Sequence, residues 1–255
     1  WWMNIAFRTG TALAALLAIL LVAALFYKDY ASLIRNNKGL VKMITPVNIV
    51  SGIGHYIDNR WFDGDRTLIS IGQDARKGPQ ILAQQKKTLV VFVLGETARA
   101  ENFSLGGYVR NTNPKLAKDN VIYYPNATSC GTETAISVPC MFSNMPREHY
   151  DASLARHQEG LLDVMAHAGV SVLWRENDGG CKGACDRVPH TDMTRWQLKN
   201  FCRDDYCLDD VLLWRLDRYL DSMKNDTVVV LHQMGSHGPA YYRRYPADKR
   251  PFTPT

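Results

Sequence analysis

The pattern of apolar and polar residues divides the chain into an apolar N-terminal stretch and a longer C-terminal part. Residues 9–27 are mostly apolar and contain no charged side chain, with Arg8 before them and Lys28 after them. At about 1.5 Å per residue, a helix of this length approaches the ~30 Å hydrocarbon core of a bilayer. Aromatic residues flank the stretch where an interfacial belt would lie, so we expect a membrane helix within residues 1–30. A signal peptide is the alternative, but no small-residue cleavage site precedes Lys28.

After Lys87 the pattern predicts an α/β domain. Three continuous apolar runs, typical of buried parallel strands, are residues 88–94, 169–174 and 227–232. Helical patterns cover residues 158–168 and 208–223. Strands that alternate with helices predict a parallel sheet covered on both faces, in which ligands bind at the carboxyl ends of the strands. Glu96 and residues 232–237 lie at such ends.

Residues 31–86 are expected to bridge these two parts. The apolar positions of residues 31–44 favour a short amphipathic helix that ends before Pro46. Residues 58–85 are rich in Gly, Asp, Arg and Gln and predict a linker at the membrane surface. The surplus of positive charge in the bridging segment suits anionic lipid headgroups, although a solvated linker fits the same composition.

The composition excludes disorder, collagen and coiled coil, because hydrophobic residues make up 46% and charged residues 22% of the chain. The net charge of +5 resides in residues 1–86, which hold 10 basic and 5 acidic side chains, whereas residues 87–255 hold 20 of each. The larger part therefore offers no broad basic surface, and we expect no nucleic-acid partner. The chain starts at Trp1 rather than Met and ends at Thr255 just beyond a polar segment, so we interpret it as a fragment.

The cysteines indicate an oxidising compartment. All six lie in three close pairs between Cys130 and Cys207, which favours local disulfides. A four-thiolate zinc site formed by the last four cysteines is the alternative, but their spacings of three and four residues suit it less than a spacing of two. The positive-inside rule would place the residues after the apolar helix in the cytoplasm, but that rule applies poorly to one helix of an incomplete chain.

Two residues are candidates for metal or phosphate chemistry. Glu96 closely follows a predicted strand, where a carboxylate can bind a cation or simply cap a loop. Thr134 lies near a predicted helix N-terminus within residues 129–140. The N–H groups of a helix N-terminus attract phosphate, and a hydroxyl beside a metal ion can act as a nucleophile. A threonine that only caps a disulfide-stapled helix is the alternative.

Three further residues could contact a metal or an anion. His232 and His237 are five apart in a Gly-rich turn after a predicted strand, an arrangement that suits metal or phosphate contacts as well as a structural role. Lys182 lies between two cysteines and either contacts an anion or is a solvated surface residue. Asn126 and Thr128 match a glycosylation pattern that is too common to interpret.

Three segments carry a resemblance to a known family: residues 93–100, 126–143 and 232–241. They resemble the phosphoethanolamine transferases that modify lipid A, a family that includes the polymyxin-resistance enzymes. The likeness extends from about Thr11 to Thr255, and the long middle segment makes chance a poor explanation. The family has a multi-helix inner-membrane domain followed by a periplasmic domain of the alkaline-phosphatase and sulfatase type. The resemblance implies an incomplete parallel α/β sheet domain of that type, preceded by one membrane helix. It assigns residues 1–30 to the last membrane helix, 31–86 to the bridging segment and 87–255 to the first part of the catalytic domain.

The resemblance also implies roles for individual residues. Glu96 resembles the family's zinc-ligand glutamate, and Thr134 resembles its nucleophile, which is also a zinc ligand. His237 resembles a histidine that contacts the phosphoethanolamine group or a second zinc ion, and Lys182 resembles a substrate-contacting lysine. The implied disulfides are Cys130–Cys140, Cys181–Cys185 and Cys202–Cys207. An Asp-His pair that completes the family's zinc site would lie beyond His237 and is not in this sequence, so we expect the 255-residue chain to be inactive by itself.

The reaction implied by the resemblance is a two-step transfer through a covalent intermediate. A zinc-activated Thr134 takes phosphoethanolamine from phosphatidylethanolamine, diacylglycerol leaves, and the group then passes to a phosphate of lipid A. Alternatives are a phosphoglycerol transferase, a sulfatase or phosphatase, and a non-catalytic, membrane-tethered disulfide module. The Cys-x-Pro-x-Arg motif of sulfatases is not found in the sequence, and the sequence does not determine which glycolipid is the acceptor.

Overall fold

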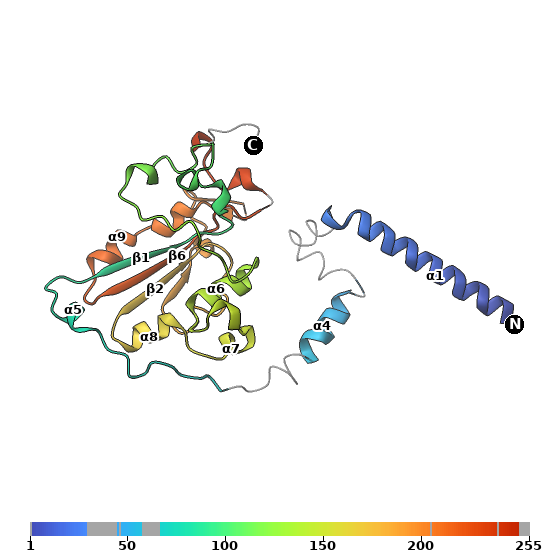
Figure 1. The fold of residues 1–255 in the computed structure, drawn as a ribbon, viewed down its shortest axis with the longest axis horizontal. Coiled ribbons are helices and arrows are strands. Elements are labelled where there is room, and N and C mark those ends of the chain that lie inside the picture. The colour runs from blue at the N-terminus through green and yellow to red at the C-terminus, as the bar shows by residue number, and fades with distance from the viewer. Residues whose placement is uncertain are drawn as a thin grey trace. The chain divides into compact units, whose positions relative to one another are not determined.

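A computed structural model describes residues 2–29, 45, 47–57, 67–204, 206–238 and 240–249, which belong to two compact units, Trp1–Arg66 and Thr67–Thr255. The first unit contains helices α1 (Trp2–Leu25) and α4 (Val47–Ile57), drawn in blue in Figure 1. By length and composition α1 can cross a membrane, and none of its residues is buried by protein. The expected helix over residues 31–44 and the linker residues 58–66 lie outside the described residues.

The second unit is built on a parallel sheet with the strand order β1-β6-β2-β3. Its strands are β1 (Leu89–Leu94), β2 (Ser171–Glu176), β3 (His190–Asp192) and β6 (Thr227–His232). A separate antiparallel pair comprises β4 (Cys202–Arg203) and β5 (Tyr206–Cys207). The three strands expected from apolar runs are confirmed. Strand β3 was not expected, because its three residues are polar or charged and form no apolar run.

Strands β2 and β6 are buried, as their apolar runs predict, whereas β1 is exposed from Leu89 to Val93, so the buried strand expected over residues 88–94 is a strand but is not buried. Alternate residues of β6 belong to two different cores: Val228 and Val230 to one, Val229 and Leu231 to the other. The first core includes Phe142 and Leu162, from α6 (Thr134–Phe142) and α8 (Leu161–His167). The second includes residues of η7 (Asp209–Leu213) and α9 (Leu216–Asp221). Figure 1 shows α6 and α8 on one side of the sheet and α9 on the other.

The remaining helices are short. They are α5 (Pro79–Leu82), α7 (Ala152–Arg156) and the single 3-10 turns Ala100–Asn102, Ser104–Gly106, Leu116–Lys118, Arg147–His149, Met193–Trp196, Tyr241–Arg243 and Ala247–Lys249.

The single helix expected over residues 208–223 is wrong, because the structure divides this segment into η7 and α9. Arg215, between them, has a φ of 53°, in the left-handed region. The buried Arg175 of β2 donates from Nη1 to the carbonyl oxygens of Leu212 and Trp214, at 2.8 and 2.7 Å. These carbonyls therefore bond to the guanidinium instead of continuing a helix, a contact that helical periodicity does not reveal.

Residues 67–86 belong to the second unit and bond to its sheet domain, whereas the sequence pattern groups them with the bridging segment. Ile69 exchanges backbone hydrogen bonds with His157 and Glu159, at 2.7 and 3.0 Å. Lys77 forms an ion pair with Asp226 at 2.7 Å, and Asp226 also accepts from the backbone N–H of Thr88, where β1 begins. The polar composition of this segment gives no sign of such backbone pairing.

The aromatic stack between α6 and the sheet yields a test of stability. Phe142 lies edge-on to both Phe92 and Trp174, with ring centroids 5.6 and 5.4 Å apart. We expect Phe142→Ala to lower the free energy of unfolding by ~3–5 kcal/mol, since it leaves a cavity between α6 and the sheet. Denaturant unfolding of the chain in detergent measures the change, with Val109→Ala, at a position 93% exposed, as the control. Equal effects of the two substitutions would contradict this packing role.

Candidate metal and phosphate site

The register of the three central strands brings polar side chains together at one edge of the sheet. His232, the last residue of β6, lies opposite Leu94 of β1 and Glu176 of β2. Two residues beyond each of these neighbours are Glu96 and Asp178. Glu96, Asp178 and His232 each offer one ligand atom, and these three atoms lie within 4.8 Å of one another. The three side chains could therefore hold a metal ion.

His232 is fully buried, and only one of its ring nitrogens has a hydrogen-bond partner. Its Nδ1 lies 2.9 Å from Oε2 of Glu176, which also accepts from Nε1 of Trp174 at 2.9 Å. Its Nε2 has no hydrogen-bond partner and lies 3.8 Å from Oδ2 of Asp178. When Nδ1–H donates to Glu176, the Nε2 lone pair faces Asp178, as in a metal ligand oriented by a carboxylate behind it.

The electrostatics of the cluster favour a cation. Burial and the charge of Glu96 raise the pKa of Asp178 to about 6, although His232, His237 and Lys182 act in the opposite direction. Burial also acts to raise the pKa of Glu176, but the hydrogen bonds from His232 and Trp174 and the charge of His232 outweigh it and hold that pKa below its usual value. Hydrogen bonds within the protein thus compensate the negative charge of Glu176. The negative charges of Glu96 and Asp178 repel each other, and a bound cation would relieve this repulsion.

Thr134 contacts this cluster directly. It is the first residue of α6, and its Oγ1 donates to Oε2 of Glu96 at 2.9 Å. The other oxygen of Glu96 accepts from Oγ1 of Thr97 at 2.8 Å. The structure therefore brings together Glu96 and Thr134, two residues that the sequence analysis singled out separately, with the hydroxyl at the N-terminus of a helix.

A glycine turn after β6 holds the backbone of Glu96. Gly235 has a φ of 53°, and a Cβ built there would lie 2.5 Å from the carbonyl oxygen of Glu96. The N–H of Ser236 donates to this oxygen at 3.0 Å. Only glycine permits both the left-handed conformation and the close approach of the two backbones.

Lys182 and His237 lie near the cluster, but their hydrogen bonds are to backbone atoms. Lys182 is in a left-handed conformation and donates to the carbonyl of Gly179 at 3.0 Å. His237 Nδ1 lies 2.8 Å from the carbonyl oxygen of Gly238. Both side chains act electrostatically on Asp178, so they belong to the surroundings of the cluster.

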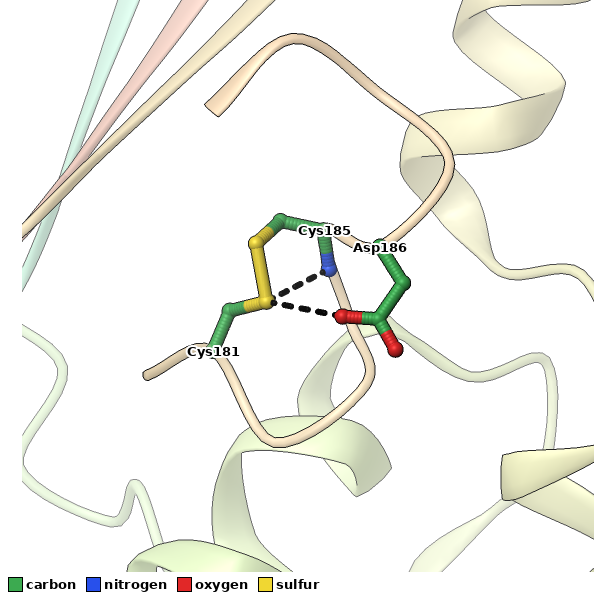
Figure 2. A group of neighbouring side chains, drawn as sticks. All are labelled: Cys181, Cys185 and Asp186. Carbon is green, nitrogen blue, oxygen red and sulfur yellow. Dashed lines mark hydrogen bonds between the residues drawn. A yellow bond between two sulfur atoms is a disulfide. The ribbon is translucent and has the colours of Figure 1, made fainter. Parts of the chain in front are cut away.

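All six cysteines are in disulfides: Cys130–Cys140, Cys181–Cys185 and Cys202–Cys207. The pairing is the one implied by the resemblance, and it excludes the four-thiolate zinc site. Figure 2 shows Cys181, Cys185 and Asp186 close together, with Asp186 Oδ1 3.6 Å from Cys181 Sγ. The two sulfurs are bonded to each other, so neither is a thiolate available to a metal ion, and this group is structural.

Sequence reasoning missed Asp178 and Glu176 and did not name His232 among the final site residues. Asp178 lies two residues after the end of β2, just as Glu96 lies two residues after the end of β1. A search for carboxylates that closely follow a strand, which identified Glu96, would therefore also have found Asp178. The run of apolar residues ended the expected strand at Trp174, however, whereas β2 continues through Arg175 and Glu176. Two charged residues inside a strand concealed where the strand ends.

Comparisons with known proteins match the whole length of the chain. The family model described as Sulfatase matches residues 88–255, and one described as Phosphoethanolamine transferase EptA/EptB matches residues 1–61. Phosphoethanolamine transferase EptA of Escherichia coli (strain K12) is 55% identical over 253 residues, which is 99% of this chain and 46% of that protein. Phosphatidylethanolamine transferase Mcr-1 of Escherichia coli is 38% identical over 264 residues, covering 100% and 49%.

A solved structure is similar over the whole chain. The integral membrane protein lipooligosaccharide phosphoethanolamine transferase A (EptA) from Neisseria meningitidis matches with a TM-score of 0.74 and 43% identity, over 100% of this chain and 47% of that one. The chain therefore spans about half the length of the relatives it matches. The resemblance and the fold class expected from the sequence are confirmed.

The turn at Gly235 yields a test of the site's architecture. Gly235→Ala would introduce left-handed strain and a clash with the backbone of Glu96, whereas Gly107→Ala, at a φ of 97° with nothing within 4 Å of its Cβ, would introduce the strain alone. We expect the clash to cost a further ~1–3 kcal/mol of unfolding free energy. Parallel denaturant titrations of the two variants measure the difference. Equal destabilisation would show that Glu96 does not depend on this close approach.

Proposed function

We propose that the whole protein transfers phosphoethanolamine from phosphatidylethanolamine to a phosphate of lipid A. The chain belongs to the sulfatase family, whose model matches residues 88–255. The observation on which the proposal rests is the hydrogen bond from Thr134 to Glu96 beside Asp178 and His232. A hydroxyl at a helix N-terminus, next to a cluster of metal-ligand side chains, suits nucleophilic attack on a phosphodiester. The names of the similar proteins support phosphoethanolamine as the group transferred and a phospholipid as its donor.

The donor set fits zinc. Glu96 and Thr134 would hold the ion together with the Asp-His pair that the resemblance places beyond this sequence. Asp178 and the unpartnered Nε2 of His232 lie close enough to contribute. Carboxylate oxygens and an imidazole nitrogen are ordinary zinc ligands, and Glu176 behind His232 supplies the outer hydrogen bond that such ligands usually have. When bound, zinc would lower the pKa of the Thr134 hydroxyl and counter the charge of the phosphoryl group.

The residues of the chain position the reaction. The Thr134 hydroxyl loses its proton as Oγ1 forms a bond to the phosphorus of phosphatidylethanolamine. The bond from phosphorus to the diacylglycerol oxygen breaks, and this oxygen takes up a proton in exchange. An oxygen of the lipid A phosphate then loses its proton and attacks the phosphorus, the bond to Thr134 breaks, and Oγ1 regains a proton. The hydrogen bond to Glu96 orients Oγ1 before the first step. Lys182 and His237, near Asp178, contact the anionic phosphate of the phosphoethanolamine group.

We also propose the location and organisation of the protein. Residues 1–30 span the inner membrane, and the catalytic unit lies in the periplasm, which agrees with three disulfides. The bridging segment, residues 31–86 in the sequence analysis, is best restricted to 31–66, since the residues after it contact the sheet unit. An apolar face of α4 supports a position at the membrane surface, since its large exposed side chains are Ile49, Val50, Ile53 and Tyr56.

Substitution of the nucleophile tests the reaction. We expect Thr134→Ala in the intact protein to lower lipid A modification at least ~10³-fold without changing the melting temperature, because the covalent intermediate can no longer form. Mass spectrometry of lipid A from cells measures the added phosphoethanolamine. Thr132→Ala, two residues earlier and exposed, is the matched control and retains activity. Unaltered modification by the Thr134 variant would exclude the mechanism, and a non-catalytic disulfide module would give that result.

Metal binding is tested separately by calorimetric titration of the metal-free intact protein with zinc. We expect Glu96→Ala to weaken zinc binding at least ~10-fold, since it removes a ligand and the partner of Thr134. Glu101→Ala, in the same segment but paired only with the exposed Arg99, should leave the affinity unchanged. A wild-type protein that binds no zinc would refute the metal assignment while leaving the fold intact.

A further inference from the structure

Asp209, the first residue of η7, bonds to both loops that contain the metal-ligand cluster. Its Oδ1 accepts from Nδ2 of Asn177 at 2.8 Å and from the backbone N–H of Met234 at 2.7 Å. Its Oδ2 accepts from the backbone N–H of Gly235 at 2.9 Å. We propose that Asp209 is a positioning residue, which sets the spacing between Asp178 and Glu96. The effect of Asp209 on metal binding rests on the zinc site proposed above.

On one side, Asp209 acts through Asn177, the residue immediately before Asp178. Asn177 is fully buried, and its backbone N–H donates to the carbonyl of His232 at 3.0 Å, which extends the sheet ladder by one step. Its side chain then reaches Asp209 and the carbonyl of Cys207, at 2.8 and 3.2 Å. The loop that presents Asp178 is therefore held at the sheet and at η7.

On the other side, Asp209 acts through the turn after His232. Its carboxylate binds two successive backbone N–H groups, those of Met234 and Gly235, and so fixes the left-handed turn at Gly235. That turn lies directly against the backbone of Glu96, and its next residue, Ser236, donates to the Glu96 carbonyl. One carboxylate thus connects the segments of Glu96 and Asp178, which come from different strands.

A carboxylate suits this position better than an amide of the same shape. Three N–H donors converge on its two oxygens, and an ionised carboxylate accepts from all of them. In Asp209→Asn one oxygen becomes an NH₂ group that faces a backbone N–H, so at least one hydrogen bond is lost and two donors oppose each other. Asp209 does not itself belong to the group of metal-ligand side chains, and its effect passes through Asn177 and Gly235.

The test is zinc titration of metal-free intact protein carrying Asp209→Asn. We expect the zinc Kd to rise 10- to 100-fold, as is usual when an outer partner of a metal site is removed. Val211→Ala is the matched control, because Val211 is fully buried in the same turn and its truncation destabilises η7 without removing these hydrogen bonds. Asp210→Asn, at the exposed neighbouring carboxylate, controls for charge. A rise in Kd no larger than that of Val211→Ala would overturn the proposal.

A second readout does not depend on zinc. In metal-free protein, we expect the backbone amides of Met234 and Gly235 to exchange with deuterium at least 10-fold faster in Asp209→Asn than in Val211→Ala. Equal exchange in the two variants would overturn the proposal even if zinc binding changed. A wild-type protein that fails to bind zinc refutes the metal site instead, and amide exchange then still decides whether Asp209 holds the turn. If Asp209→Asn does not fold, Asp209→Glu, which keeps the charge but moves the oxygens, is compared with Asp210→Glu in the same two measurements.

Discussion

The parallel register of β1, β6 and β2 is the constraint on which the site depends. In that register the carboxyl ends of three strands that are remote in sequence finish in one row, with His232 between Leu94 and Glu176. Parallel strands need crossover connections, and here these connections contain α6, α8, η7 and α9, which bury both faces of β6. The same packing that makes the central strand a core element therefore leaves its last residue, a histidine, buried at an edge where charged side chains gather. A shift in register would separate His232 from Glu176 and remove the hydrogen bond that orients its ring.

Burial at this edge divides the carboxylates into two kinds. Glu176 receives hydrogen bonds from His232 and Trp174 and stays ionised inside the protein. Asp178 receives less compensation, and its pKa rises to about 6 because burial and Glu96 disfavour its charge. Proteins retain such poorly compensated charge where function requires it, since it lowers stability in the absence of a ligand. The contrast between two carboxylates separated by one residue is therefore better evidence for a cation site than the number of acidic residues.

Much of the fold could be predicted from the sequence, because the signals were local. The apolar runs of β1, β2 and β6 required no knowledge of distant contacts, and Glu96 was identified because it closely follows one of them. The break between η7 and α9 could not be predicted, since it arises when Arg175 binds the carbonyls of Leu212 and Trp214 across the sheet. The place of Asp178 was hidden for a related reason, because Arg175 and Glu176 extend β2 beyond its apolar run. In both cases a charged residue is buried by a partner far away in sequence, and hydrophobic periodicity records no such partner.

The disulfides complement the sheet by covalently closing loops that pack against its two cores. Each closes a short loop: the first joins Cys130, before α6, to Cys140 inside α6 and encloses Thr134, the second encloses Lys182, and the third ends two residues before Asp209. Cys181 and Cys185 belong to one core and Cys202 and Cys207 to the other, and each covalent link also removes part of the unfolded-state entropy of its loop. The sheet thus determines where Glu96, Asp178 and His232 meet, and the disulfides restrict the loops that surround them. Strand ends thus hold the candidate metal ligands, and the disulfide-closed loops hold Thr134 and Lys182 beside them.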